Sequence, residues 1–244
     1  MRWRAGAWPG CRGAFRRSCT PRRRAPNSGW WGADPLTALP APPLLLITDR
    51  ALAGRDLAEV VASACAGGCR WVSLREKDLS AVDQIDLFAR LRAVTTPFGV
   101  RLTLHGPPEL ALAASADGVH LSGGGDAAAA RALLGPEALV GLSTHTLAEA
   151  AAADPALLDY ITASPAFLTR SKPGHGPALG VEGLSAFARA SAVPVVALAG
   201  IDAENAPACL TAGAKGVAIM GAIMCADDPR AAFAALTARA SSAS

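Results

Sequence analysis

Eight short apolar runs alternate with segments of helical period between residues 44 and 240, and this alternation restricts the fold more than any other feature of the chain. Apolar strands separated by helices indicate a parallel sheet that is covered on its outer face. Eight such units within about 200 residues predict an α/β protein with a single (β/α)8 TIM barrel. The expected strands are Leu44–Thr48, Arg70–Leu74, Arg101–Leu104, Gly118–Leu121, Leu139–Leu142, Tyr160–Ala163, Pro194–Leu198 and Gly216–Met220.

Amphipathic segments lie between these runs and are expected to form the outer layer of helices. A doubly wound open sheet is the alternative arrangement. Its dinucleotide-binding version is disfavoured, because no Gly-x-Gly-x-x-Gly follows the first run. The expected helices are Asp56–Ala66, Ala81–Val94, Pro108–Ser115, Ala127–Leu134, Leu147–Ala153, Val181–Ala190, Ala203–Ala212 and Arg230–Ala240.

Residues 1–43 follow neither period and are rich in Arg, Pro, Gly and Trp. Such a composition predicts a disordered basic extension. A start assigned too far upstream and an Arg-rich targeting segment are the alternatives. The barrel domain is therefore expected to span residues 44–240.

Charge and hydropathy limit the partners of this domain. Residues 1–40 contain eight Arg and one acid, Asp34, so their balance is +7; because the whole chain carries +3, the remainder carries −4. A mildly acidic domain argues against a nucleic-acid surface. No apolar stretch of about 18 residues is present, so no membrane span is expected. We expect a cytoplasmic protein with small-molecule partners, whose oligomeric state, homo-oligomer included, stays open.

Polar or glycine residues follow nearly every expected strand. In (β/α)8 barrels the catalytic groups lie at the C-terminal ends of the strands, so this ring predicts a functional site at that end. Its members are Thr48, Asp49, Arg50, Arg75, Glu76, Lys77, His105, Ser122, Ser143, Thr144, His145, Ser164, Gly200 and Gly221.

Glycines in the last two loops predict a phosphate site. Gly200 and Gly221 follow the seventh and eighth expected strands, which is the usual phosphate position in such barrels. A glycine lets a phosphate approach backbone N–H groups closely. Two ordinary tight turns are the alternative.

Cationic residues in two further loops could hold anionic groups. Arg75 and Lys77 alternate with Glu76, so both cations are expected to point the same way, Arg offering a fork and Lys a point charge. Thr169-Arg170-Ser171-Lys172-Pro173 opens the longest internal loop, which is typical of a lid or clamp. Solvated basic loops are the alternative.

Two histidines carry different expectations. His145 follows the fifth expected strand, where an imidazole can exchange protons near neutral pH. A structural hydrogen bond to the adjacent helix is the alternative. His120 lies within a strand and is expected in the core or the barrel interior.

These motifs, in this order, resemble the thiamine phosphate synthase/TenI family. The resemblance covers nearly the whole barrel, and its specificity comes from the combination. The motifs are Leu46-Ile47-Thr48-Asp49-Arg50, Leu74-Arg75-Glu76-Lys77, Ala116-Asp117-Gly118-Val119-His120-Leu121, Ser143-Thr144-His145, Ser164-Pro165-Ala166-Phe167 with Thr169-Arg170-Ser171-Lys172-Pro173, and Gly200-Ile201.

The resemblance implies a transferase of thiamin biosynthesis. Synthases of this family join hydroxymethylpyrimidine diphosphate to thiazole phosphate and release pyrophosphate, with Mg²⁺. By position, the resemblance implies two groups of residues on these small phosphorylated substrates. Arg75, Lys77, Ser143 and Lys172 would hold the diphosphate or assist its departure, and Thr169, Ser171, Gly200, Met220 and Gly221 would hold the thiazole phosphate.

The sequence departs from the family pattern at three places. The synthases' Gln before Leu-Arg-Glu-Lys is Ser73, and their Asn-Asp after the third strand is His105-Gly106; Ser73 and His105 are therefore expected on the substrate. The synthases' Asp after the fourth strand is Gly125, with Asp126 one residue later. Because Mg²⁺ needs hard oxygen ligands, these losses weaken the expected metal site and leave Asp126 as its candidate ligand.

Two other functions stay open. TenI-type thiazole tautomerases need no Mg²⁺ and use a histidine at the position of His145 as acid and base. The retained Lys77, Ser171 and Lys172 favour the synthase. The second alternative is a regulatory or carrier barrel that binds thiazole phosphate without turnover.

Overall fold

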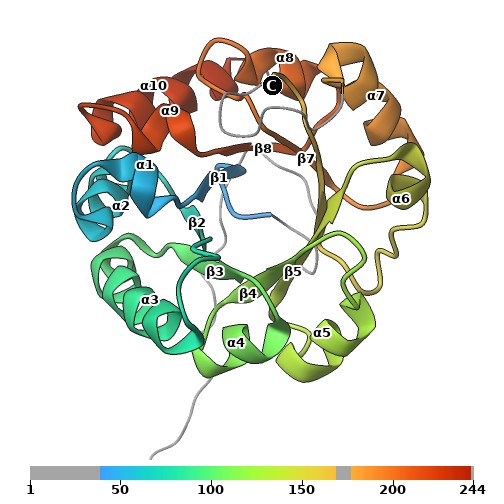
Figure 1. Ribbon diagram of the computed structural model, residues 1–244. Helices are drawn as coiled ribbons and strands as arrows, with labels where there is room; N and C mark the ends of the chain where they lie inside the picture. The colour runs from blue at the N-terminus through green and yellow to red at the C-terminus, as the bar shows by residue number, and fades with distance from the viewer. Residues whose placement is uncertain (1–38, 169–176, 243–244) are drawn as a thin grey trace, which may run out of the picture. The chain divides into compact units, whose positions relative to one another are not determined.

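Eight parallel strands close into one barrel in the order β1-β2-β3-β4-β5-β6-β7-β8 (Figure 1). The computed structural model describes residues 39–168 and 177–242. The predicted (β/α)8 barrel is confirmed. The strands are β1 Leu44–Ile47, β2 Trp71–Leu74, β3 Arg101–His105, β4 Gly118–Leu121, β5 Leu139–Thr144, β6 Tyr160–Ala163, β7 Val195–Leu198 and β8 Gly216–Ile219.

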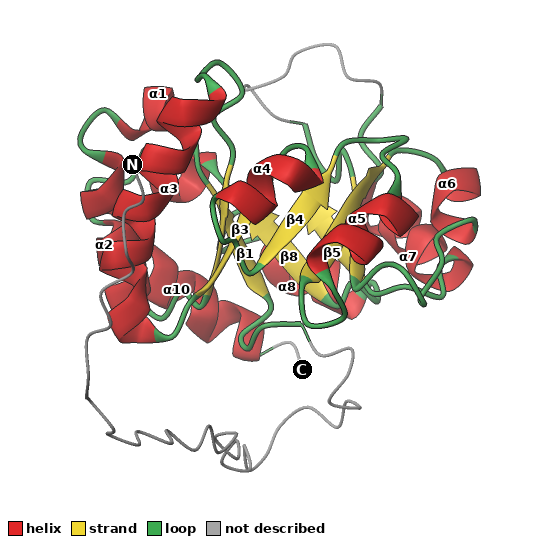
Figure 2. Ribbon diagram, turned by 90° about the horizontal axis from the view of Figure 1, so that it is seen from below, coloured by secondary structure: helices red, strands yellow, loops and turns green. Residues whose placement is uncertain are grey.

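Helices surround the ring of strands on its outer side (Figures 1 and 2). They bury the outward face of the sheet, as the continuous apolar runs require. The helices are α1 Arg50–Ala53, α2 Leu57–Ala66, α3 Ala81–Thr95, η1 Thr96–Phe98, α4 Pro108–Ala113, α5 Ala127–Leu134, α6 Leu147–Ala151, α7 Gly180–Ala190, α8 Ala206–Thr211, α9 Gly221–Met224 and α10 Pro229–Ser241.

Side-chain caps set several helix starts. The Asp56 carboxylate accepts hydrogen bonds from the amides of Ala58 and Glu59, so α2 begins one residue later than expected. Asp126 and Asp228 cap α5 and α10 in the same way. A capped start leaves fewer amide groups without a partner, which fixes where each helix enters the outer layer.

Two apolar regions are separated by the strands. The larger lies between the strands and the helices. The smaller fills the inside of the barrel, as expected for a packed interior rather than a pore. Its buried members are Leu45, Ile47, Trp71, Leu139, Tyr160, Val196 and Ala218.

Two aspartates tie strands together at the N-terminal end of the barrel. The Asp117 carboxylate accepts a hydrogen bond of 2.6 Å from the Leu102 amide, and Asp159 accepts one of 2.7 Å from the Val140 amide. Arg131 forms a salt bridge of 2.7 Å with Asp159. Since each aspartate directly precedes a strand, these contacts fix the register in which that strand enters the sheet.

The bounds differ from those expected at a few places. β4 and β6 have the predicted bounds, whereas β3 continues to His105 and β5 to Thr144. The helices α1 and α9 were missed; each has four residues, fewer than a periodicity window needs. Most of residues 1–43 lie outside the described part. Over that part, no helix is long and apolar enough to cross a membrane.

Candidate active site

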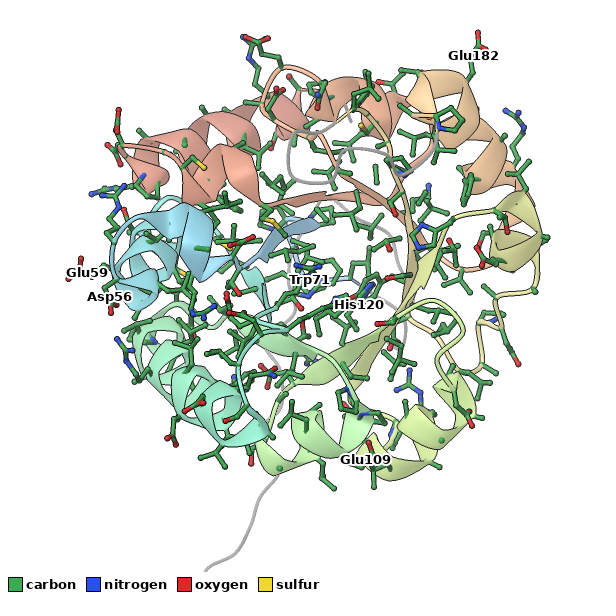
Figure 3. All side chains as sticks on the ribbon, in the orientation of Figure 1. Asp56, Glu59, Trp71, Glu109, His120 and Glu182 are labelled. Carbon is green, nitrogen blue, oxygen red and sulfur yellow. The ribbon has the colours of Figure 1, made fainter. Side chains whose placement is uncertain are left out.

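Polar side chains replace apolar ones inside the barrel toward the C-terminal ends of the strands. Alternate residues of a strand share a face. Ser73 therefore faces the same way as the interior residue Trp71, and Thr162 the same way as Tyr160. Figure 3 shows Trp71 and His120 inside the ring of strands. The interior thus has an apolar floor and a polar upper layer.

His120 lies at the centre of this polar layer and is 3% exposed. Its Nδ1 lies 3.0 Å from the Tyr160 hydroxyl, and its Nε2 lies 2.9 Å from the Ser143 hydroxyl. The His105 ring packs against it with centroids 4.9 Å apart. Burial, and then the charges of Lys77 and Arg75, lower the pKa of His120 from 6.5 to about 3. The expectation of an interior position is confirmed, and the imidazole is neutral at physiological pH.

A glycine makes this arrangement possible. His120 pairs with Gly141, and Gly141 pairs with Tyr160 on the next strand. A Cβ atom at Gly141 would lie 2.1 Å from Cζ of Tyr160. The tyrosine ring therefore occupies the space of the missing side chain and reaches His120 across β5.

Arg75 and Lys77 flank a buried carboxylate that has its own partners. Glu76 is 3% exposed. Its carboxylate accepts a hydrogen bond of 2.8 Å from the Thr48 hydroxyl and forms a salt bridge of 3.3 Å with Arg50. Within residues 39–168 and 177–242, the Arg75 guanidinium donates no hydrogen bond and forms no ion pair. No described side chain therefore neutralises the Arg75 charge by direct contact.

His145 is exposed and is oriented by Ser164. Its Nδ1 lies 3.1 Å from the Ser164 carbonyl oxygen and 3.1 Å from the Ser164 hydroxyl. The carbonyl oxygen can only accept, whereas the hydroxyl can donate or accept, so these contacts hold the ring through Nδ1 and leave Nε2 out of them. The backbone amide of His145 donates to Glu149 at the start of α6. The imidazole is thus positioned structurally and keeps one nitrogen for a ligand.

The two predicted phosphate glycines differ in what requires them. Gly200 has φ +67°, and a Cβ there would lie 2.7 Å from the Leu168 carbonyl oxygen, so the fold itself excludes a side chain. The preceding residue, Ala199, also has a positive φ, +82°. Gly221 has no such φ, and nothing lies within 4 Å of a Cβ built on it. Packing against the described residues therefore does not require a glycine at this position, and its role in binding a phosphate stays a prediction.

The long loop after β6 is held at its base beside Gly200. The amides of Ala166 and Phe167 donate to the carbonyl oxygens of Leu198 and Ala199, at 2.8 and 3.1 Å. At the other end, Gly180 donates to Ala166 at 2.9 Å. The predicted ligands Thr169, Ser171 and Lys172 lie outside the described residues. The chain enters and leaves that segment next to the β7 loop.

Some polar atoms of the interior were not identified from the sequence. In the described part of the chain, the Ser73 hydroxyl, the Thr162 hydroxyl and the Trp71 indole N–H are buried without a hydrogen-bond partner. Buried polar groups are normally paired, so these atoms are candidate contacts for a ligand or water. Ser73 was predicted. Thr162 and Trp71 could have been found only from strand alternation once the register is known.

The oxygen ligands that Mg²⁺ would need are not gathered here. Among the described residues, no group of three or more His, Cys, Asp or Glu is placed to hold a metal. Asp126, the predicted ligand, caps α5 by accepting a hydrogen bond of 2.9 Å from the Ala129 amide. Asp49 caps α1, and Glu76 is engaged as described. These three described carboxylates are therefore already engaged in caps, hydrogen bonds or a salt bridge, and the prediction that Asp126 binds Mg²⁺ stays a prediction.

The protein is thus a (β/α)8 barrel whose C-terminal end carries cationic and hydroxyl groups around an interior histidine. A family model described as thiamine monophosphate synthase matches residues 44–223. The chain belongs to this thiamine monophosphate synthase (TMP-TENI) family, as the sequence motifs predicted.

Individual relatives agree. A Geobacter sulfurreducens protein, provisionally named a thiamine-phosphate synthase, is 47% identical over 80% of this chain and 92% of its own length. The thiamine-phosphate synthase of a Roseiflexus species is 40% identical over 81% of this chain and 85% of its length. Thiamine phosphate pyrophosphorylase from Pyrococcus furiosus superposes with a TM-score of 0.73 at 30% identity, covering 82% of this chain and 96% of that one.

The depressed pKa of His120 predicts a specific pH dependence of stability. The pKa of His120 is about 3 in the folded protein and 6.5 in the unfolded chain, so between these pH values only the unfolded chain protonates the imidazole. The contribution of His120 to stability is therefore fully present above pH 6.5 and falls as the pH is lowered. We compare the free energy of unfolding of the wild type with that of His120→Asn. The wild-type value minus the variant value should fall by about 1.4 kcal/mol per pH unit below pH 6. Urea unfolding at pH 7, 6, 5 and 4 measures it. Carboxylates are common to both proteins and cancel; a pH-independent difference would contradict the expectation.

Asp126→Asn separates a capping role from a metal-ligand role. Asn caps helices as well as Asp does, so we expect unchanged thermal stability and an unchanged calorimetric titration of Mg²⁺ in the presence of pyrophosphate. Asp126→Ala, the comparison variant, should lose about 1 kcal/mol of stability with the cap. Loss of Mg²⁺ binding in Asp126→Asn would show that Asp126 is a ligand after all.

Proposed function

We propose that this chain is a thiamine phosphate synthase, a transferase that couples hydroxymethylpyrimidine diphosphate with thiazole phosphate. The observation that supports the proposal is that His120 is hydrogen-bonded to Ser143 and feels the charges of Arg75 and Lys77, in a chain of this family. A cationic, hydroxyl-bearing site of this kind suits a diphosphate.

The reaction needs stabilisation of a leaving group rather than an acid or base. The C–O bond between the pyrimidine methylene and the diphosphate breaks, and its electron pair leaves with pyrophosphate. The thiazole nitrogen supplies the pair for the new C–N bond and becomes the positive nitrogen of the thiazolium. No proton is gained or lost by the carbon framework. Groups that stabilise negative charge on the departing oxygen therefore lower the barrier.

Arg75, Lys77 and Ser143 are the residues that would provide this stabilisation. The Arg75 guanidinium can present two N–H groups to phosphate oxygens, and Lys77 adds a point charge. The buried Glu76 does not cancel them locally, because Thr48 and Arg50 already bind its carboxylate. The role predicted for Lys172 belongs to this proposal on the family resemblance alone.

The thiazole phosphate would bind at the loops after β7 and β8. Gly221 offers an open approach to backbone N–H groups, and Gly200 and Met220 border it in the two loops. Thr169 and Ser171 are assigned there by resemblance. The second substrate would then enter from the β7–β8 side, which β1 separates from the β2 loop that carries Arg75.

Thiazole tautomerisation is the second candidate, because Ser164 holds the exposed His145 through Nδ1 and its Nε2 takes no part in those contacts. Such a reaction moves a proton and requires an acid and base, which His145 can provide. It does not require the Arg75 cation.

Two assays on the full chain distinguish the candidates. One supplies hydroxymethylpyrimidine diphosphate, thiazole phosphate and Mg²⁺ and follows thiamine phosphate. The other supplies the thiazole carboxylate phosphate of the tautomerases and follows isomerisation. We expect product in the first, reduced about 10²-fold by Arg75→Ala and little changed by His145→Ala.

Arg239→Ala is the matched control, because it removes an exposed arginine from α10 on the outer layer; it should leave the rate unchanged. Product only in the second assay, lost in His145→Ala, would replace the synthase with the tautomerase. Absence of product in both, with saturable binding of thiazole phosphate, would identify a binding protein.

Gly221→Ala tests the phosphate position without disturbing the fold. A Cβ at Gly221 meets nothing within 4 Å, and Ala is favoured over Gly in a helix, so stability should be unchanged or slightly higher. The methyl group would obstruct a phosphate at the backbone amides, and KM for thiazole phosphate should rise about tenfold or more. Ala222→Ser, at the next and exposed position, is the control. An unchanged KM in Gly221→Ala would place the phosphate elsewhere.

A further inference from the structure

Three side chains on three neighbouring strands form one hydrogen-bonded chain inside the barrel. Tyr160 on β6 contacts Nδ1 of His120 on β4, and Nε2 of His120 contacts Ser143 on β5. Tyr160 is fully buried and His120 is 3% exposed, whereas Ser143 is half-buried at the C-terminal end of its strand. The chain therefore runs from the closed interior toward the ligand side.

Both interior members keep one protonation state. His120 is neutral, because burial and the neighbouring cations lower its pKa. Burial raises the pKa of the Tyr160 hydroxyl well above its ordinary value of 10.0, so this group remains an O–H. A neutral imidazole carries one N–H and one lone pair, and the remaining question is which nitrogen holds the proton.

The buried hydroxyl of Tyr160 decides this question. In the described part of the chain, His120 Nδ1 is its one hydrogen-bond partner. If Nδ1 carried the proton, the hydroxyl proton of Tyr160 would be buried without an acceptor, which costs about 1–3 kcal/mol. The favoured arrangement has Tyr160 donating to Nδ1 and the imidazole proton on Nε2.

The direction of donation then continues to Ser143. The Nε2–H group donates to the Ser143 oxygen, so the hydroxyl proton of Ser143 is left to point away from His120. In the opposite tautomer, with the imidazole proton on Nδ1, the Ser143 hydroxyl would donate its hydrogen bond to Nε2 and present only lone pairs to a ligand. A donor suits an anion, and a lone pair repels it.

We propose that Tyr160 and His120 are positioning residues that hold Ser143 as a hydrogen-bond donor to an anionic oxygen at the C-terminal end of the barrel. That the anion is the diphosphate of the first substrate rests on the proposed function. Gly141 belongs to the same device, since its missing side chain lets Tyr160 reach across β5. The arrangement stabilises the leaving group without any reorientation of the serine during the reaction.

The tautomer is measured on the resting protein by ¹⁵N NMR of labelled histidine, with His120→Asn used to assign the signals. The wild type should show the Nε2–H form of His120. Tyr160→Phe removes only the hydroxyl and should give a mixture of the two forms. A wild-type Nδ1–H form, or an Nε2–H form that persists alone in Tyr160→Phe, would overturn the proposal.

A double-mutant cycle tests whether Tyr160 acts through Ser143. Tyr160→Phe should lower kcat about three- to tenfold with little change in KM for thiazole phosphate. In the Ser143→Ala background the same substitution should have no effect on kcat, because the hydroxyl it orients is gone. An equal loss in both backgrounds would show that Tyr160 acts by packing alone, and would overturn the proposal.

Thr95→Val is the control for losing a buried hydroxyl. Thr95 lies on α3 and donates to the Leu91 carbonyl oxygen at 2.8 Å; its replacement should leave kcat and the His120 tautomer unchanged. Calorimetric binding of inorganic pyrophosphate repeats the cycle without turnover. If pyrophosphate binding shows coupling between Tyr160 and Ser143 but no thiamine phosphate forms, the proposed function fails and the positioning proposal stands. If thiamine phosphate forms but neither the kcat cycle nor the binding cycle shows coupling between Tyr160 and Ser143, the proposed function stands and the positioning proposal fails.

Discussion

A closed ring of eight strands leaves an interior that side chains must fill, and the arrangement of every functional group follows from how this chain fills it. Large apolar residues such as Leu45, Trp71 and Leu139 occupy the floor. Above them the inward positions change to hydroxyls and imidazoles, because that layer borders the ligand side. Gly141 lets one large ring, Tyr160, take part in both layers. The packing of the interior thus determines the polarity of the site.

The charged residues after β2 are also divided between a buried side and the side that faces the ligand. Arg75, Glu76 and Lys77 are consecutive, and the carboxylate between the two cations would reduce their effect on an anion if it faced the ligand. It is instead buried against Thr48 and Arg50. A buried carboxylate is tolerated only when such partners satisfy it. Residues at the β1–α1 turn therefore offset the free-energy cost of burying Glu76. The positive charges of Arg75 and Lys77 remain where they act on His120.

The sequence predicted the barrel because each strand is a short local apolar run and most helices are local patterns of period 3.6. It predicted less of the site, since the decisive contacts join residues far apart in the chain. His120 was expected in the interior, but its partners depend on the register of β4, β5 and β6. Gly141 reads as an ordinary strand glycine until Tyr160 is placed beside it. Glu76 could not be distinguished from a metal ligand without seeing its bonds to Thr48 and Arg50.

The departures at Gly106 and Gly125 acquire a physical meaning from these contacts. Among the described residues, the groups of this chain that can meet negative charge on a leaving group are N–H and O–H donors and cations. Donors differ from a metal ion in that a hydroxyl can rotate and present its lone pairs. A serine is a dependable substitute only when a neighbour fixes its direction. His120 does so for Ser143, and it can do so only while it stays neutral and its other nitrogen is held by Tyr160. Tyr160, although fully buried in the barrel interior, is therefore part of what makes this site suitable for an anion.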